Sequence, residues 1–328
     1  MYQIFDILVD CYLPLFELPK IKQGSVSLKI NLSPNAQYKF ADLVWQNHWY
    51  SEEKQIAISS TRKGDGSYLI RYVNLADFHV SAALDSIVVH PAAGTNQETI
   101  RHLLLDQLIP RILGQRGKLI LHASAVTFQN DSSIAFLGSS GWGKSTIASS
   151  FAQHGFDLIS DDCLQLDTIN EKIIGIPAYT GTRLFPDSIE ALYPQPPDFS
   201  PVCHYSEKKR LHTPPYSHCS QRAITAIFLL NDPADQNHST VITIEPVKGA
   251  ASLMTLIKRC FLLDMKDIKI AAKLFKKAAQ AQANGLDIYS LSYPRDYDKL
   301  ADLRTEILST INQQKQIGVT PFAGSTST

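Results

Sequence analysis

The sequence predicts an α/β protein with a strand-rich N-terminal lobe, and three observations support this. The chain has 328 residues, a length at which a single hydrophobic core usually splits, so we expect two lobes. Residues 1–95 alternate apolar and polar positions between turn signals, which is typical of strands. From residue 96 onward helical spacing alternates with short apolar runs. We therefore divide the chain into a β-rich lobe over 1–95, an α/β domain over 96–317 and a flexible polar tail over 318–328.

The elements of the N-terminal lobe follow from its periodicity. Residues 25–30 and 68–73 alternate apolar and polar side chains, and the glycines at 64–66 mark a turn between them. The spacing then changes, because apolar residues recur three and four positions apart over 97–113 and predict a helix. We expect Pro110 to kink this helix and the glycines that follow to end it.

The α/β domain is predicted to continue as alternating strands and helices. The expected strands are 118–122, 134–137, 157–160, 163–166, 172–176, 223–230, 241–245 and 286–293, and the expected helices are 144–154, 249–261, 264–283 and 296–313. Prolines interrupt the stretch 194–220 repeatedly, so we expect a long exposed loop there.

Composition and charge exclude several functional classes. Lys plus Arg and Asp plus Glu are both 31, so the net charge is zero and nucleic acid is not an expected partner. The apolar opening is cut by Asp6, Asp10 and Pro14 and has no basic leader, so it predicts neither a signal peptide nor a membrane span. The five cysteines are odd in number and scattered, which predicts a reduced, cytoplasmic protein without a membrane partner.

A phosphate-binding loop is the strongest motif in the chain. Residues 138–145 fit the pattern G-x-x-x-x-G-K-S/T, with a predicted strand before it and a helix after it. The glycines let consecutive backbone N–H groups point at phosphate oxygens, Lys144 reaches the outer phosphates and the Ser145 hydroxyl ligates Mg²⁺. We expect ATP and Mg²⁺ as cofactors, the nucleotide being held by Gly138, Ser139, Ser140, Gly141, Trp142, Gly143, Lys144, Ser145 and Thr146.

An acidic pair follows the loop. Asp161 and Asp162 come directly after a short predicted strand, sixteen residues past Ser145. Carboxylates at that position can hold Mg²⁺, and one of them can accept the proton of an attacking hydroxyl. Neighbouring side chains on a strand point to opposite faces, so only one should face the phosphates unless the strand ends there. The alternative is that one aspartate caps a turn while the other is solvated.

His122 lies on the predicted strand before the loop, within the run Leu121–Val126. A single histidine on an apolar strand is ordinarily a hydrogen-bonded core residue. That alternative stays open beside a catalytic role.

These motifs together resemble the catalytic domain of the HPr serine kinase/phosphorylase family. The similarity lies in the order and spacing of 121–126, 138–146, Gly155 and 160–162, and the continuation through 177–186 resembles the branch found in peptide-modification gene clusters. The resemblance implies a fold related to phosphoenolpyruvate carboxykinases and a serine-phosphorylating activity. It also implies that Asp161 and Asp162 take the base and metal positions, with His122 beside the phosphates. Family members often form rings, so a homo-oligomer is expected on this basis alone.

One segment departs from the family. Residues 173–179 stand where the bifunctional enzymes carry a glycine-rich signature with a glutamate used in metal binding and dephosphorylation. The resemblance therefore does not extend to phosphorylase activity or to HPr as the substrate.

Two further groups of residues are candidates with ordinary alternatives. Arg183 could stabilise charge on the transferring phosphoryl group, and the basic run 208–210 could contact phosphate or an acidic peptide; the alternative is a solvated basic loop. Within the proline-rich stretch, several side chains are of types that bind zinc, although their spacing fits no closed zinc site. These are Cys203, His204, His212, His218 and Cys219.

The sequence thus predicts an ATP- and Mg²⁺-dependent kinase that phosphorylates a serine of a protein or peptide partner. The predicted catalytic residues are Asp161, Asp162, His122 and Arg183, and the predicted metal ligands are Ser145 and Asp161. One alternative is a kinase for a small hydroxyl compound on the same scaffold. Another is a non-catalytic nucleotide-binding partner of a peptide-maturation complex.

Overall fold

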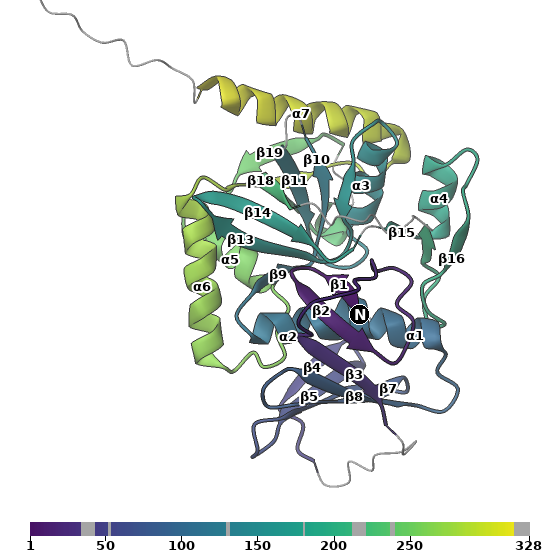
Figure 1. Ribbon diagram of the computed structural model, residues 1–328. Helices are drawn as coiled ribbons and strands as arrows, with labels where there is room; N and C mark the ends of the chain where they lie inside the picture. Colours follow the sequence, from purple (N-terminus) through teal and green to yellow (C-terminus); the bar gives the residue numbers. More distant parts are fainter. Residues whose placement is uncertain are drawn as a thin grey trace, which may run out of the picture.

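The computed structural model contains two large sheets with helices packed between and around them (Figure 1). It describes residues 1–33, 43–51, 54–128, 132–179, 181–211, 221–236 and 240–317. The mixed α/β character predicted from the sequence is confirmed.

The first sheet is formed by the N-terminal part of the chain. Among the described residues it has eight strands in the order β1-β2-β3-β8-β7-β6-β5-β4. Most neighbours are antiparallel, but β3 pairs in parallel with both β2 and β8. The strands are β1 (Tyr2–Ile4), β2 (Ile7–Cys11), β3 (Leu28–Leu32), β4 (Asn47–Tyr50), β5 (Ile56–Arg62), β6 (Tyr68–Tyr72), β7 (Ala76–Val80) and β8 (Ser86–Pro91).

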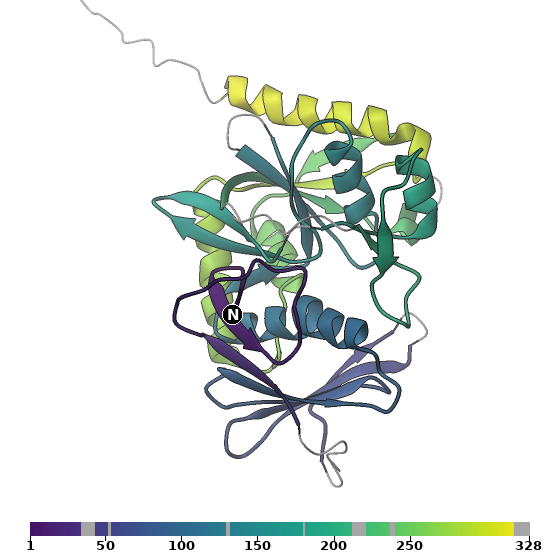
Figure 2. The ribbon, with the colours of Figure 1, turned by 45° about the vertical axis from the view of Figure 1, so that its right-hand side comes forward.

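A long helix packs against this first sheet and not only against the second sheet, which is described below. It runs as α1 (Gln97–His102), a π-helical stretch η1 (Leu103–Leu108) and α2 (Ile109–Gln115). Its leucines share one core cluster with Phe78 and Val89 of the first sheet. Residues beyond 96 therefore contribute to the N-terminal core (Figure 2).

The helix ends where Gly117 predicted, because its last helical residue is Gln115 and Gly117 follows the C-cap with a φ of 84°. It continues through Pro110, which occupies the first turn of α2 after the π-helical stretch, where a missing N–H is tolerated. Gly114 lies inside the helix, because a Cβ there would lie 1.8 Å from the carbonyl oxygen of Phe261. This glycine allows close packing of two segments instead of terminating the helix.

The second sheet carries the phosphate-binding loop. Its main path is β12-β10-β11-β18-β14-β13-β9, and β20 joins it alongside β18 and pairs with β19. The three strands β11, β18 and β20 are parallel, so their carboxyl ends meet at one edge. The strands are β9 (Leu119–Leu121), β10 (Ala123–Thr127), β11 (Ser132–Leu137), β12 (Leu158–Ser160), β13 (Leu164–Ile169), β14 (Lys172–Pro177), β18 (Arg222–Leu230), β19 (Thr243–Pro246) and β20 (Asp287–Ser292).

Helices cover both faces of this sheet. One core cluster joins α3 (Lys144–Ala152) and α7 (Leu300–Ile317) to it, and a second cluster joins α5 (Ala250–Lys258) and α6 (Ile268–Ala283). Figure 1 shows the two helix pairs on different sides of the strands. The start of α6 differs from the prediction, because the Asp267 side chain caps the helix by accepting from two backbone N–H groups. No helix within the described ranges combines the length and the apolar character needed to cross a membrane.

In the described part of the proline-rich stretch, residues 194–211, the prediction of a long loop without regular structure was wrong, while 212–220 lie outside the described residues. The described part contains β16 (Phe199–Pro201) and β17 (Lys209–Leu211), which join β15 (Arg183–Leu184) in a small sheet of order β15-β17-β16. The proline of β16 sits at the end of an edge strand, where its missing N–H breaks no ladder bond. The helix α4 (Pro186–Leu192), which the sequence did not predict, begins with a proline after β15. Short 3₁₀ turns occupy Pro233–Gln236 and Tyr297–Lys299.

Candidate site for nucleotide binding and phosphoryl transfer

The phosphate-binding loop connects β11 to α3 at the carboxyl edge of the second sheet. β11 ends at Leu137, and α3 begins at Lys144 with Gly143 as its N-cap. Gly141 and Gly143 have φ values of 77° and 88°, a region that side-chain-bearing residues rarely adopt. A Cβ on Gly143 would also lie 2.6 Å from the Tyr293 hydroxyl. The loop geometry therefore depends on glycine at these positions.

Lys144 is folded back over this loop. Its Nζ donates to the Ser139 carbonyl at 2.8 Å, and the side chain is buried. Burial lowers its pKa to about 8, although Asp162 opposes the shift. A phosphate group would supply acceptor oxygens and negative charge for an ammonium that has one hydrogen-bond partner among the described residues.

Asp161 of the acidic pair contacts Ser145 at the start of α3, and the charge of Asp162 acts on Lys144. Because β12 ends at Ser160, the two side chains are not bound to opposite faces of a strand. Asp162 has a φ of 71°, a strained conformation of the kind that clusters at functional sites. Asp161 Oδ1 accepts from Ser145 Oγ at 2.8 Å and from Ser124 Oγ at 2.5 Å. The alternative of a capped turn with one solvated aspartate is therefore not what the structure shows.

The two aspartates differ in their surroundings. Asp161 is 1% exposed, and burial together with the neighbouring charge of Asp162 raises its pKa. Burial acts in the same sense on Asp162, but the Arg183 guanidinium and a hydrogen bond from His122 outweigh it and hold the pKa of Asp162 well below its usual range. Asp162 is also the more exposed of the two, with 15% of its side chain accessible. The pair thus has an inner member beside Ser145 and an outer member that is ionised.

His122 lies at the break between two strands. β9 pairs with β13 while β10 pairs with β11 and β12, and His122 is the single residue between them. Its Nε2 lies 3.5 Å from Asp162 Oδ1, and its ring packs near Phe261. Burial and the charge of Lys144 lower the pKa of His122 to about 4, so the ring is neutral near pH 7. The structure thus brings His122 to the acidic pair.

Arg183 is buried and not part of a solvated loop. Its side chain is 1% exposed, its backbone N–H donates to Asp161 Oδ2 at 3.0 Å, and its Nη1 donates to Asp162. Burial opposes its charge, but Asp106 and Asp162 more than compensate and raise its pKa. The three residues of the basic run 208–210 differ in exposure. Lys208 lines the cleft over the loop, Lys209 is exposed and Arg210 is mostly buried.

Asp106 forms a second acidic centre that the sequence analysis missed. It lies in the π-helical stretch and is 2% exposed. Its Oδ1 accepts from Tyr179 Oη at 2.5 Å and from Arg183 Nη2 at 2.7 Å, and its Oδ2 lies 2.7 Å from His102 Nδ1. Arg210 Nη2 is 3.9 Å from the same carboxylate. A charged residue inside a run of leucines was the one signal that could have identified it.

The sequence analysis also missed two arginines that contact the phosphate-binding loop. Arg259 donates to Ser139 Oγ at 2.6 Å and lies over the Trp142 ring at 4.8 Å. Arg295 follows β20, donates to the Trp142 carbonyl at 2.5 Å and lies over the Tyr293 ring. Arg295 could have been found from the sequence, because residues just after parallel strands gather at the same edge as the loop.

A cleft of about 320 Å³ opens above the loop. Lys144, Ser145 and Thr146 line its base, and Thr146 Oγ1 is 3.1 Å from Ser188 Oγ of α4. Tyr293, Arg295 and Tyr297 line the side formed after β20, while Arg183, Phe185 and Lys208 line the opposite side. The cleft therefore joins the predicted nucleotide-binding residues to the acidic pair through Ser145 and Arg183.

The residues beside the loop suit a magnesium ion. Ser145 and Asp161 present oxygen atoms 2.8 Å apart, and Mg²⁺ takes oxygen ligands, usually one or two from the protein with phosphate and water supplying the rest.

The zinc hypothesis concerns residues of the proline-rich stretch. Cys203 and His204 lie together after β16, but His212, His218 and Cys219 fall outside the described residues, and in the part that is described no three His, Cys, Asp or Glu side chains form a metal cluster.

Comparisons with known proteins give a distant structural likeness. No protein-family model matches the sequence, and no match was found among curated proteins. Among solved structures, the Hpr(Ser) kinase/phosphatase from Coxiella burnetii matches with a TM-score of 0.31 and 12% identity, over 61% of this chain and 99% of that chain. A likeness this distant carries no argument about function, which has to be argued from the site.

Proposed function

We propose that this protein is an ATP-dependent serine kinase that transfers the γ-phosphoryl group to a hydroxyl of a protein or peptide. The observation that carries the proposal is that the two aspartates of the acidic pair have different contacts. Asp161 touches Ser145, the loop residue expected on Mg²⁺, while Asp162 stands on the more exposed side between His122 and Arg183. The resemblance of the sequence motifs to the HPr kinase family supports the same reaction class.

In this proposal Asp161 and Ser145 hold the metal, and Asp162 is the base. The acceptor oxygen forms a bond to the γ-phosphorus, the bond from that phosphorus to the bridging oxygen of ADP breaks, and the hydroxyl proton passes to Asp162. Mg²⁺, when bound, would offset charge on the phosphates. A carboxylate with a lowered pKa is a weak base, but phosphoryl transfer depends mainly on positioning and electrostatic stabilisation.

The cations of the site are placed to stabilise charge on the phosphates. Lys144 reaches over the loop, and Lys208 and Arg183 line the opposite side of the cleft. Arg183 is held by two carboxylates, so we assign it mainly to orienting Asp162 and only secondarily to the transferring group. Neutral His122 can accept or donate one hydrogen bond beside Asp162, which fits a role in orienting the acceptor hydroxyl.

The test is to incubate the full chain with labelled ATP, Mg²⁺ and each polypeptide encoded beside its gene, followed by mass spectrometry to locate the phosphate. We expect one acceptor serine to gain phosphate, with the gain abolished by Lys144→Ala. Phosphate found on a small hydroxyl compound instead would reject the polypeptide acceptor. Tight ATP binding without transfer to any acceptor would reject the kinase and leave a nucleotide-binding partner.

A further inference from the structure

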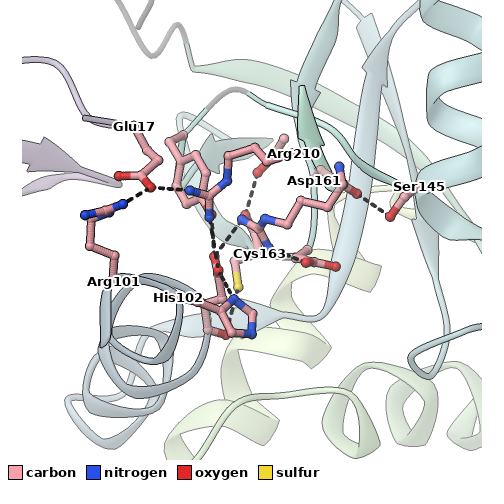
Figure 3. A network of polar contacts seen from close by, with 12 residues as sticks. Glu17, Arg101, His102, Ser145, Asp161, Cys163 and Arg210 are labelled. Carbon is pink, nitrogen blue, oxygen red and sulfur yellow. Dashed lines mark hydrogen bonds and ion pairs between the residues drawn. The ribbon is translucent and has the colours of Figure 1, made fainter. Parts of the chain in front are cut away.

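A second, larger cavity lies beside the small sheet of β15, β17 and β16. Its volume is about 610 Å³, and it lies between the N-terminal segment, the start of α1 and the β16–β17 connection. Phe16, Pro201 and Leu211 form apolar parts of its wall, whereas Glu17, Arg101 and Arg210 supply charged groups. Figure 3 shows these three charged side chains facing one another. No residue of the phosphate-binding loop lines it.

The two arginines of this cavity share a single carboxylate oxygen. Glu17 Oε1 accepts from Arg210 Nη1 and lies 3.4 Å from Arg101 Nε, while Glu17 Oε2 is buried without a hydrogen bond. Arg101 Nε and Arg210 Nε and Nη2 are also buried, with almost no accessible surface, and have no hydrogen-bond partner among the described residues. By contrast, Arg71 and Asp77 elsewhere in the chain pair through two bonds of 2.8 Å. The arginines of the cavity therefore lack the paired geometry that a guanidinium adopts with its own carboxylate.

We propose that this cavity binds a carboxylate group between Arg101 and Arg210, the two guanidinium-bearing side chains that line it. Both side chains are mostly buried, with 9% and 11% exposed, and a bound carboxylate would contact the part of each that faces the cavity. Glu98 reaches Arg101 Nη2 only at 3.4 Å and is half exposed, and Asp106 lies 3.9 Å from Arg210.

The charge of the cavity favours a carboxylate over a phosphate. Arg101 and Arg210 are formally balanced by Glu17 and Glu98, so a doubly charged group would meet more repulsion than a singly charged one. The carboxylate could belong to a free dicarboxylate or to an acidic side chain of a polypeptide. For a polypeptide, the apolar wall would accept the neighbouring side chains.

The cavity is coupled in space to the transfer site. Arg210 is the cross-strand partner of Arg183 in the β15–β17 pair, and both guanidinium groups lie near Asp106 and over the Tyr179 ring. Arg183 lines the cleft above the loop, whereas Arg210 lines the second cavity. A carboxylate bound to Arg210 would therefore act one strand away from the side chain that holds Asp162.

The test is a calorimetric titration of the full chain carrying Lys144→Ala, with succinate and, separately, with an oligoglutamate peptide. The Lys144→Ala background weakens anion binding at the loop, and no turnover is measured, so the result is independent of the proposed kinase activity. We expect saturable binding that Arg101→Gln weakens about tenfold or more, the loss typical of a charge-assisted hydrogen bond. The matched control is Lys209→Gln, which removes an exposed charge from β17 and should change the affinity less than twofold.

The two probes identify the source of the carboxylate. Binding of succinate indicates a free dicarboxylate, and binding of the peptide alone indicates an acidic polypeptide. If Arg101→Gln does not fold, Arg101→Lys replaces it, and the loss of the guanidinium fork should still weaken binding at least threefold. Absence of saturable binding by either probe overturns the proposal, as does an equal loss in Arg101→Gln and Lys209→Gln.

Discussion

The two walls of the candidate site are assembled in different ways. The loop wall comes from one continuous segment, 138–146, whose glycines and helix start define where a phosphate can sit. The opposite wall is built around Asp106 from side chains that lie far apart in the sequence, including Tyr179, Arg183 and Arg210. A backbone motif can thus be recognised from spacing alone, whereas a cluster of buried counter-ions exists only once the chain has folded.

The two walls also differ in how substitutions should affect stability. The loop wall depends on backbone conformation and presents its donors toward the cleft, so substitutions there should affect binding or chemistry before folding. The Asp106 wall consists of buried charges that neutralise one another. Removal of one partner leaves another charge uncompensated in a region with little water. Substitutions there should therefore affect both stability and chemistry.

The largest effect is expected for Asp162→Asn, at the point where the two walls meet. Loss of the carboxylate removes the proposed base, and such a loss typically lowers a rate by about 10²–10⁴-fold. The affinity for ATP should change only slightly, because Asp161 and Ser145 still face the metal position. Steady-state phosphorylation and a separate ATP-binding titration measure the two quantities.

The matched control for this substitution is Asp167→Asn. Asp167 is on β13 and pairs with Lys277 at 3.0 Å on the surface, so both rate and affinity should stay within twofold. An Asp162→Asn protein that retained more than a tenth of the parent rate would show that Asp162 is not the base.

Asp106→Asn should show most clearly that the two walls differ in how much they contribute to the free energy of unfolding. It removes the charge that Arg183 and Arg210 share, and breaking a buried ion pair costs about 3–5 kcal/mol. Urea unfolding measures the free energy. The control is Asp77→Asn, which breaks a more exposed pair with Arg71 and should cost about 1 kcal/mol or less. Equal losses in the two variants would contradict the special position of Asp106.

A smaller effect is expected in the pH dependence of stability. His122 has a pKa of about 4 in the folded protein against an ordinary value of 6.5, so as the pH falls the unfolded chain takes up this proton first. The contribution of His122 is therefore fully present above pH 6.5 and is lost as the pH falls towards 4. His122→Gln should flatten the curve in this window by on the order of 2 kcal/mol.

Urea unfolding of parent and His122→Gln at several pH values measures this difference. Asp162 does not obscure it, because a carboxylate with a lowered pKa loses its contribution only below its ordinary value of 3.8. Asp161, whose pKa is raised, has the opposite slope in part of the window, but it is present in both proteins and cancels in the comparison. Parallel curves for parent and variant would mean that His122 is not held neutral by its surroundings.

The sequence predicted the loop wall because its information is local. The spacing of glycines, Lys144 and Ser145, with a strand before and a helix after, describes a backbone shape that needs no distant partner. The acidic pair was placed correctly next to the loop for the same reason, since β12 ends directly before it. Which carboxylate lies inside and which outside depended on Arg183 and His122, and so on folding.

The Asp106 wall could not be predicted by the same reasoning. The ordinary alternative for Arg183 was a solvated basic loop, yet it is buried because Asp106 and Asp162 lie on either side of its guanidinium. The strands β16 and β17 have three residues each, and β17 also pairs with the two-residue strand β15, so no periodicity reveals them. In β17, Arg210 contacts Glu17 and lies near Asp106, two residues far away in the sequence, and no local pattern predicts these contacts.

The smallest effect is expected for Arg259→Gln, because Arg259 contacts the loop wall without belonging to it. Its guanidinium donates to Ser139 Oγ and lies over the Trp142 ring, two contacts that hold the loop from outside the cleft. Loss of a partly exposed cation–π contact is worth about 0.5–1 kcal/mol, so the Kd for ATP should rise about threefold to fivefold while the unfolding free energy hardly changes. Arg259→Lys is the matched control, because it keeps the charge but loses the planar group that stacks on the indole. If the contact acts through charge alone, Lys will restore the affinity; if stacking matters, Lys will bind ATP as weakly as Gln. A loss of stability comparable with that of Asp106→Asn would instead place Arg259 in the folded core and remove the distinction between the two walls.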